Sequence, residues 1–415
     1  MVKDILKNIC LLTLLLTANL SLAAEFKANG LVDVRLSSNE TNKSYLSGGY
    51  GKFSSNSSST LAIPQLAGEF KVLWDNGLSA NLVINSYIEN DQSDIGMTEA
   101  YVKYKSIPNS SGYRWENRSG VFYPKISLEN EAFGWASINT LNSSTLNTWV
   151  GEETKLLGTQ AKITRLGRQN GNDFDLSLSA SIFANNDPSG ALLSWHGWTM
   201  SNRQTIWQQS RPFPQMPASK IGGSLEHQAK RSNAFLEIDN RLGYQLQFDW
   251  HQHKKGKFNI GYYDNRAKPY IVKNGQYGWG TKFVYAGAQW RFNKELQLTA
   301  QVLKGSTLMQ SPKKQDVVNN DYQSAFVSLT KRRKKHSYTL RLEEFSVTDN
   351  DSTVGDNNAE YGKAATFNYT YRYSKPWFLS FEYNWIKSDR PSRAYQNQAV
   401  DLTEQQYQLA ARYFF

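Results

Sequence analysis

Cysteine is almost absent from this chain: its one cysteine among 415 residues, Cys10, lies in an apolar N-terminal segment. Disulfides, thiolate metal sites and thiol nucleophiles are therefore excluded for the rest of the chain. Long apolar runs are missing as well, because beyond this segment none approaches the roughly 18 residues that a membrane-spanning helix needs. Histidine is scarce, with five residues in all, and no Ser–His–Asp order, phosphate-binding loop or nucleic-acid motif is present.

The N-terminal segment has the layout of a secretory signal peptide. Two lysines precede an apolar run over residues 9–16, and small residues follow up to Ala24. This apolar run is too short for a permanent transmembrane helix. We expect residues 1–24 to direct export and to be cleaved, leaving residues 25–415 as the mature protein.

The rest of the chain is rich in strands that have one apolar and one polar face. At the C-terminus, Tyr407, Leu409, Ala411, Tyr413 and Phe415 alternate with more polar residues up to the last position. This two-residue period is that of a half-buried strand. Similar segments recur throughout, and the expected strands are 25–37, 60–75, 77–88, 96–106, 117–123, 155–168, 173–184, 241–253, 257–265, 277–292, 295–304, 322–331, 336–347, 362–374, 377–387 and 404–415.

Alternation alone does not distinguish a membrane barrel from a soluble sandwich, so the connections and aromatic residues must decide. Short turns such as 75–77 and 374–376 alternate with long polar connections, as in outer-membrane barrels, whose turns face the periplasm and whose loops face outward. Trp74, Trp290 and Trp377 lie beside short turns, as an interfacial aromatic band requires. The expected long connections are 38–59, 125–154, 185–240, 305–321, 349–361 and 388–403.

These features predict an all-β fold, a transmembrane antiparallel up-and-down β-barrel of about 16 strands with long extracellular loops. The number becomes 18 if residues 234–240 pair with an earlier strand near 219–229 within the connection 185–240. A barrel of this width is not filled by its own wall side chains and leaves an aqueous channel.

Length, signal, strand number and tail resemble those of Gram-negative outer-membrane porins. The stretch "SGVFYPKISLENEAFGW" (119–135) resembles the passage from strand to inserted loop in the phosphate-selective-type porin family. The resemblance implies location in the outer membrane of a Gram-negative bacterium, contact with lipid and lipopolysaccharide, and a homotrimer. It also implies that the barrel-assembly machinery reads the C-terminal tail, through Tyr407, Leu409, Tyr413 and Phe415.

The expected function is passive diffusion of small hydrophilic solutes through a water-filled channel, without enzymatic activity. The net charge of +11 suggests an anion- or phosphate-selective porin as an alternative. However, many lysines and arginines lie at short turns, and the inward-facing charges are of both signs, which favours a general pore. The cations expected on the pore wall are Arg35, Lys71, Lys103, Arg291, Arg341, Arg372 and Arg412.

The connection 125–154 is the expected constriction. It carries the charged residues Lys125, Glu129, Glu131, Glu152 and Glu153 around a long uncharged stretch. A loop folded into the lumen would place these carboxylates opposite the wall cations. The alternative is a solvated extracellular loop with scattered charge.

The sequence allows two further functions. Trp195, Trp198 and Trp207 in the connection 185–240 could stack on sugar rings in a saccharide porin, although such residues more often fix a long loop to the rim. An outer-membrane barrel hydrolase would need His196 or His227 at the rim. Neither histidine has an evident nucleophile partner, so this is the weaker alternative.

No cofactor and no nucleic-acid partner are expected, but two metal-like patterns occur. In the loop 349–360, Asp349, Asp351 and Glu360 occupy the first, third and twelfth positions of a calcium loop. Valine stands where such a loop needs glycine, so a polar surface loop is the preferred interpretation. His251 and His253 share one strand face, with no third ligand evident nearby.

Overall fold

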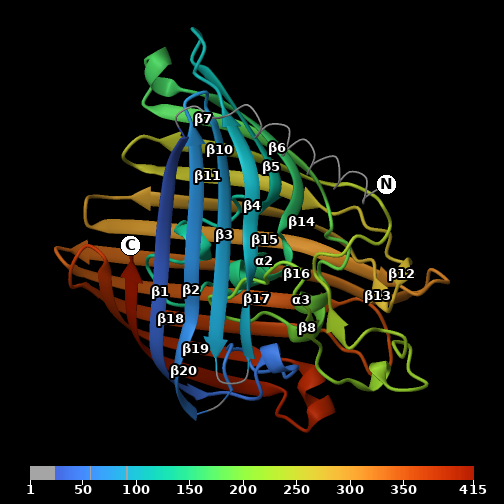
Figure 1. The fold of residues 1–415 in the computed structure, drawn as a ribbon. Coiled ribbons are helices and arrows are strands. Elements are labelled where there is room, and N and C mark those ends of the chain that lie inside the picture. Colours follow the sequence, from blue (N-terminus) through green and yellow to red (C-terminus); the bar gives the residue numbers. More distant parts are fainter. Residues whose placement is uncertain (1–23, 57, 90–91) are drawn as a thin grey trace.

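The computed structural model describes residues 24–56, 58–89 and 92–415, so the expected signal peptide lies outside the described residues except for Ala24. Sixteen antiparallel strands form one closed barrel (Figure 1). Each barrel strand pairs with the next along the chain, and the last strand pairs with the first. The predicted fold class is therefore confirmed. The 18-strand alternative is wrong, because residues 234–240 lie outside the barrel sheet.

The strand bounds follow the alternating pattern closely. The barrel strands are β1 (Ala24–Glu40), β2 (Ser58–Trp74), β3 (Leu78–Glu89), β4 (Gln92–Lys105), β5 (Tyr113–Phe122), β6 (Leu156–Arg165), β7 (Phe174–Ala184), β10 (Gly243–Gln252), β11 (Gly256–Asp264), β14 (Gly280–Arg291), β15 (Leu296–Gln310), β16 (Asp316–Arg333), β17 (His336–Asp349), β18 (Glu360–Arg372), β19 (Trp377–Asp389) and β20 (Asp401–Phe414). Two small sheets pair β8 (Arg211–Pro212) with β9 (Arg231–Ser232), and β12 (Val272–Lys273) with β13 (Gln276–Tyr277).

The helical elements are short and belong to the connections. They are η1 (Tyr45–Ser47), η2 (Phe133–Trp135), α2 (Thr145–Glu153), η3 (Gly167–Asn170), α3 (Ala191–His196), η4 (Pro217–Ser219) and η5 (Pro391–Gln396). Among the described residues, no helix has the length and apolar character needed to cross a membrane.

The outer face of the barrel is apolar and exposed. In β20, Tyr407 and Leu409 are 44% and 56% exposed, whereas Gln406 and Gln408 point inward and are buried. A closed sheet with an apolar exterior satisfies its backbone hydrogen bonds internally, which is the requirement for a strand in lipid. The protein is therefore a transmembrane β-barrel. Exposed aliphatic residues on this face include Leu36, Leu61, Leu82, Leu178, Ile182, Leu246, Ile260, Val284, Val302, Val327, Leu340, Leu342, Leu379 and Leu409.

The two ends of the barrel differ in their connections. At the end that we call the turn end, strands are joined by short segments such as 75–77, 253–255 and 334–335. The opposite end, which we call the loop end, carries the long connections. The prediction of a long connection at 305–321 is wrong. The strands β15 and β16 remain paired through most of this range, and only residues 311–315 lie between them.

Aromatic rings form a band at the turn end. Trp250 of β10 stacks on Trp290 of β14, with ring centroids 6.0 Å apart and planes at 9°. Trp377 packs on Tyr413 at 4.7 Å. Amphipathic rings of this kind are favoured at the boundary between lipid and water.

The last residue of the chain takes part in barrel closure. The amide of Gly30 in β1 donates to the carbonyl of Phe415 at 2.8 Å, and the amide of Phe415 donates back to Gly30 at 3.0 Å. Gly30 leaves room for the Phe415 ring, because a Cβ there would overlap it. The ring remains 64% exposed on the outer face. Phe415 thus combines seam hydrogen bonds with an apolar surface at the turn end.

Deleting Phe415 should lower the amount of folded protein in the membrane several-fold, because the deletion removes both seam hydrogen bonds and the exposed ring. The measurement is the fraction of membrane protein that changes gel mobility on boiling, since a sealed barrel resists detergent until heated. Phe292→Ala is the matched control, because Phe292 is 56% exposed at the turn end but lies away from the seam. Equal folded fractions for both variants would contradict the proposed role of the C-terminal residue.

Candidate functional site: a partly filled barrel lumen

The connection between β5 and β6, residues 123–155, lies inside the ring of strands (Figure 1). We call it the inserted loop. It contains α2, whose N-terminus is capped by Ser144: the side-chain oxygen accepts a hydrogen bond from the Asn147 amide at 3.2 Å. All nine residues of α2 are buried. A helix on the outer rim would expose one face to water, so the burial places α2 within the packed interior.

Arg341 of β17 fixes the inserted loop to the barrel wall. Its Nε donates to Glu343 of the same strand at 2.7 Å, and its Nη1 pairs with the carboxylate of Glu129 in the loop. The same guanidinium donates to the carbonyls of Asn142 and Ser143 at 3.0 and 3.1 Å. A charge buried in this way is stable only when its donors are satisfied. Arg341 therefore requires the loop in its inserted position.

Two more arginines hold the loop at the neighbouring wall. Arg35 of β1 and Arg412 of β20 share the carboxylate of Asp33, at 2.6 and 2.7 Å. Arg35 also donates to the carbonyl of Leu141 at 3.1 Å, and Arg412 to that of Ser137 at 2.8 Å. We call Arg35, Arg341 and Arg412 the anchor arginines. All three were predicted on the pore wall, and all three are covered by the inserted loop.

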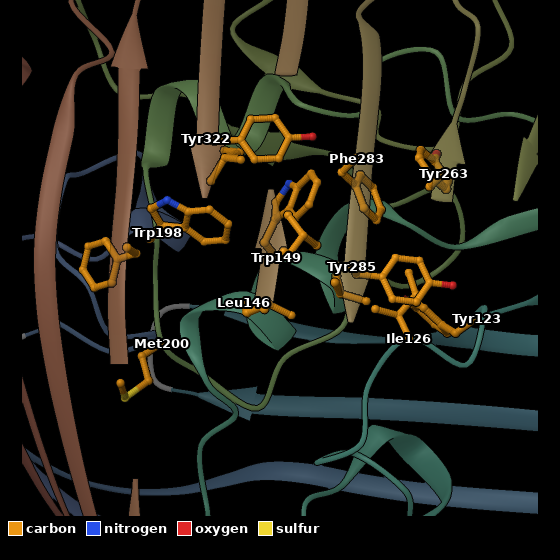
Figure 2. Close-up of a cluster of buried hydrophobic side chains, with 14 of the residues drawn as sticks. Tyr123, Ile126, Leu146, Trp149, Trp198, Met200, Tyr263, Phe283, Tyr285 and Tyr322 are labelled. Carbon is orange, nitrogen blue, oxygen red and sulfur yellow. The ribbon is translucent and has the colours of Figure 1, made fainter. Parts of the chain in front are cut away.

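An aromatic cluster fills the space between α2 and the wall (Figure 2). Trp149 of α2 makes edge contacts with Phe283 at 5.3 Å, Tyr322 at 5.2 Å and Trp198 at 6.0 Å. Phe283 and Tyr322 belong to the wall strands β14 and β16. The packing of these rings excludes water from this part of the lumen.

The long connection between β7 and β10 also enters the barrel. Its residues 198–207, which we call the crossing segment, begin at Trp198, whose Nε1 donates to the carbonyl of Ser346 in β17 at 3.0 Å. At the other end, the amide of Trp207 donates to the carbonyl of Met97 in β4 at 2.8 Å. Since β17 and β4 belong to different parts of the wall, the segment crosses the lumen.

The space that remains lies beside β2–β7, β10 and β11. It consists of a cavity of about 600 Å³ and an adjoining cavity of about 350 Å³, which together we call the free lumen. Charges of both signs line it, with basic residues in slight excess. They are Lys71, Lys103, Lys105, Arg114, Arg118, Lys125, Lys162 and Lys257, together with Glu69, Glu99, Glu116, Glu131, Asp175 and Asp249.

Three cations of this lining, Lys105, Arg118 and Lys125, have no carboxylate of the described residues within salt-bridge distance. Lys103 and Lys162, by contrast, pair with Glu116 and Asp249 at 2.5 and 3.4 Å. Of the three, Lys125 belongs to the inserted loop. Partial desolvation inside the barrel and the nearby charges of Arg118, Lys162 and Lys103 lower the pKa of Lys125 to about 8, although its side chain is exposed to the free lumen. At neutral pH it is still mostly charged, so the free lumen carries an uncompensated positive charge.

Comparison with known proteins supports the fold but not a family, since no family model and no curated protein matches the chain. The outer membrane channel DcaP of Acinetobacter baumannii superposes with a TM-score of 0.57 and 12% identity, covering 95% of this chain and 98% of that chain. An anion-selective porin from Comamonas acidovorans gives 0.52 and 12%, covering 95% and 100%. OmpT of Vibrio cholerae, in its trimer form, gives 0.51 and 9%, covering 95% and 100%. The chain has a porin fold.

Within this porin fold, the predicted constriction residues separate into two groups. Lys125 and Glu131 line the free lumen. Glu129, Glu152 and Glu153 are buried instead, and burial raises the pKa of Glu152 and of Glu153 to about 7.

Glu153 illustrates what the buried carboxylates do. It accepts hydrogen bonds from the Trp149 indole at 2.6 Å and from the amides of Gly190 and Leu192 at 3.0 Å. These contacts tie α2 to the start of α3. The Glu153 carboxylate therefore holds α2 and the start of α3 together in the barrel interior and does not line the free lumen.

The other predicted wall cations lie at open surfaces. Lys71 and Lys103 face the free lumen. Arg291 lines a hollow of about 720 Å³ at the turn end, and Arg372 lies over the ring of Phe378 at 5.6 Å.

The sequence analysis does not include Arg114 and Arg118 of the free lumen among the wall cations. Arg114 lies outside the expected strand 117–123, because β5 begins at Tyr113. Arg118 lies within the expected strand but is not assigned to the pore wall there. The alternation of Arg114, Glu116 and Arg118 with outward residues could have revealed them.

Of the three tryptophans expected as sugar-stacking candidates, two are buried and the third, Trp207, is partly exposed with one face against another ring. Trp195 and Trp198 are 1% and 0% exposed. Trp207 is stacked on Phe235 with centroids 6.1 Å apart. These rings hold the long connection in place, which was the preferred interpretation.

The suggested calcium loop is not assembled. Glu360 points into the barrel, where it pairs with Lys52 and, at 3.3 Å, with Arg390. In the described part of the chain, neither cluster of three potential metal ligands includes Asp349 or Asp351. The residue expected as the twelfth-position ligand is thus paired with protein cations.

The two rim histidines lack the partners of a hydrolase. His196 is buried and its Nε2 lies 2.8 Å from the carbonyl of Pro212, and burial lowers its pKa to about 3. His227 is exposed beside Glu226 at 3.4 Å. Neither ring bonds to a serine or threonine hydroxyl among the residues described.

Arg341→Ala should release the inserted loop, because it leaves Glu129 and Glu343 buried without their cation. Breaking a buried ion pair in this way costs roughly 3–5 kcal/mol. Amide hydrogen exchange across residues 123–155 is the measurement, and exchange should accelerate in the variant. Arg372→Ala is the control, since Arg372 is exposed and contacts no part of the loop that is described. Equal protection in both variants would show that Arg341 does not hold the loop.

Proposed function

We propose that the protein is an outer-membrane channel of a Gram-negative bacterium that allows passive diffusion of small hydrophilic solutes. The observation that carries this proposal is the free lumen: cavities of about 600 and 350 Å³, lined by charged side chains, remain beside the inserted loop. A barrel with only a scaffold role has no need for a cavity lined by charged side chains. The proposal is also supported by structural neighbours described as a channel and as an anion-selective porin.

The proposed constriction lies between Lys125 and Glu131 of the inserted loop and the wall residues Lys103 and Lys162. These four side chains belong to the lining of the free lumen. A low-dielectric wall strengthens the effect of each charge on a passing solute. Glu116 and Asp249 lie beside Lys103 and Lys162, so the lining presents charges of both signs. Such a lining orients polar solutes without excluding either sign of ion, which suits a general diffusion channel.

A second candidate is an anion-preferring channel. The observation that favours it is Lys125, which has no carboxylate partner among the described residues and lies near Arg118, Lys162 and Lys103. Such a group raises the local concentration of small anions such as phosphate or a carboxylate. This alternative differs from the first only in selectivity.

We further propose that the chain is exported by residues 1–24, assembled by the machinery that reads the tail ending at Phe415, and surrounded by lipid and lipopolysaccharide. A homotrimer is proposed by analogy with the Vibrio cholerae protein, which is described in a trimer form. No cofactor is needed for diffusion through such a channel.

Reconstitution in a planar bilayer tests the function and the selectivity together. Discrete conductance steps in potassium chloride are expected, and their absence would reject the channel. Under a salt gradient, Lys125→Gln should shift the reversal potential toward cation preference, because it removes from the free lumen a positive charge that no carboxylate of the described residues pairs with.

Lys375→Gln is the matched control, because Lys375 lies exposed in the turn 373–376 and lines none of the cavities described here. Exposed charges beyond the Debye length of about 8 Å at physiological salt have little influence on ions at a constriction. A shift with Lys375→Gln and none with Lys125→Gln would mean that the constriction lies elsewhere.

In the same apparatus, Arg341→Ala should raise the conductance by freeing the inserted loop.

A further inference from the structure

A group of metal-ligand side chains lies at the turn end of the free lumen. Asp175 of β7 and His251 of β10 are directly opposite each other in the strand register. His253 follows in the turn 253–255 and returns to the same side. The Nε2 of His253 lies 3.0 Å from Oδ1 of Asp175, and the Nδ1 of His251 lies 3.9 Å from its Oδ2. All three potential ligand atoms lie within 4.8 Å of one another.

The backbone on both sides of this group is held in place. The Gly167 amide donates to Oδ1 of Asp175 at 2.8 Å, and the His253 amide donates to the carbonyl of Asp173 at 2.8 Å. The first contact orients the carboxylate, and the second fixes the turn that carries the histidine. Ligands that are oriented by such contacts lose less entropy when they bind an ion.

The separations suit a small transition-metal ion. Two ligands at 2.0–2.1 Å from a tetrahedral centre are about 3.3 Å apart, a value between the two distances seen here. Asp175 and His251 also belong to the lining of the 600 Å³ cavity, so further coordination positions would face water. Two imidazoles and one carboxylate match the preferences of Zn²⁺, Ni²⁺ and Cu²⁺, whereas Ca²⁺ and Mg²⁺ prefer oxygen ligands.

We propose that Asp175, His251 and His253 form a binding site for a divalent transition-metal ion at the turn end of the free lumen. The bound ion completes its coordination with water or with a solute group from the lumen. It adds two positive charges to the wall where solutes enter or leave.

Metal binding is tested directly on the folded full-length protein in detergent, without a polyhistidine tag and after removal of metals with a chelator. Calorimetric titration with Zn²⁺ should show one site per chain. The variants His251→Gln, His253→Gln and Asp175→Asn should each lower the affinity for Zn²⁺ by about tenfold or more. His227→Gln is the matched control, because this exposed histidine lies outside the cluster, and its affinity should equal that of the unmodified protein.

Two further measurements make the result decisive. Cu²⁺ bound to the unmodified protein should show electron paramagnetic resonance couplings to two imidazole nitrogens, and the double variant His251→Gln/His253→Gln should lose them. The mobility shift on boiling shows that each variant is folded. Absence of Zn²⁺ binding to the unmodified protein, or equal affinity in the double variant, would overturn the proposal.

The effect of the ion on conduction rests on the proposed channel function, and the binding measurements do not. Zn²⁺ added from the turn end should reduce the current of the unmodified channel and leave the double variant unaffected. If Zn²⁺ binds at this cluster but no current is seen under any condition, the metal site stands and the channel function fails. If current is present but titration shows no binding, the channel stands and the metal site fails.

Discussion

The ion pairs between the wall and the inserted loop determine how the interior of this barrel is divided. Arg341, Arg35 and Arg412 would each be hydrated in an open pore, but here each is buried against loop carbonyls and carboxylates. Removing water from a guanidinium is costly unless its donors find partners. Loop insertion and arginine burial are therefore mutually dependent, because neither is favourable without the other.

The aromatic packing follows from this dependence. Trp149 can contact Phe283 and Tyr322 only because the loop carries α2 into the interior, and Trp198 of the crossing segment completes the cluster. The inserted loop also contacts β2 and β4, where Gln65 donates to the Gly134 carbonyl and Glu99 accepts from the Tyr123 amide. The part of the lumen beside β4–β7, β10 and β11 nevertheless stays open. Its charges then pair mainly along the wall, as Lys103 does with Glu116, and remain in contact with water.

The strands were predictable because lipid and lumen impose opposite demands on successive residues, as Leu409 and Gln408 show. Whether a wall cation is buried could not be predicted in the same way. Arg341 and Lys103 both face inward from alternating strands, yet the inserted loop covers only Arg341. That difference depends on the position of the inserted loop, whose Asn142 lies 199 residues before Arg341 in the sequence. Likewise, His251 and His253 were recognised as a pair, but Asp175 joins them only through the register of β7 with β10.

The two sides of the lumen also differ in electrostatics. On the covered side, the anchor arginines are neutralised at contact distance by Asp33, Glu129 and Glu343, so little field extends from them into the open space. The field there comes from the side chains of the free lumen itself, where Lys105, Arg118 and Lys125 have no carboxylate of the described residues within salt-bridge distance. The covered side is packed by the inserted loop and the crossing segment, whereas the charged side chains of the free lumen line the open side.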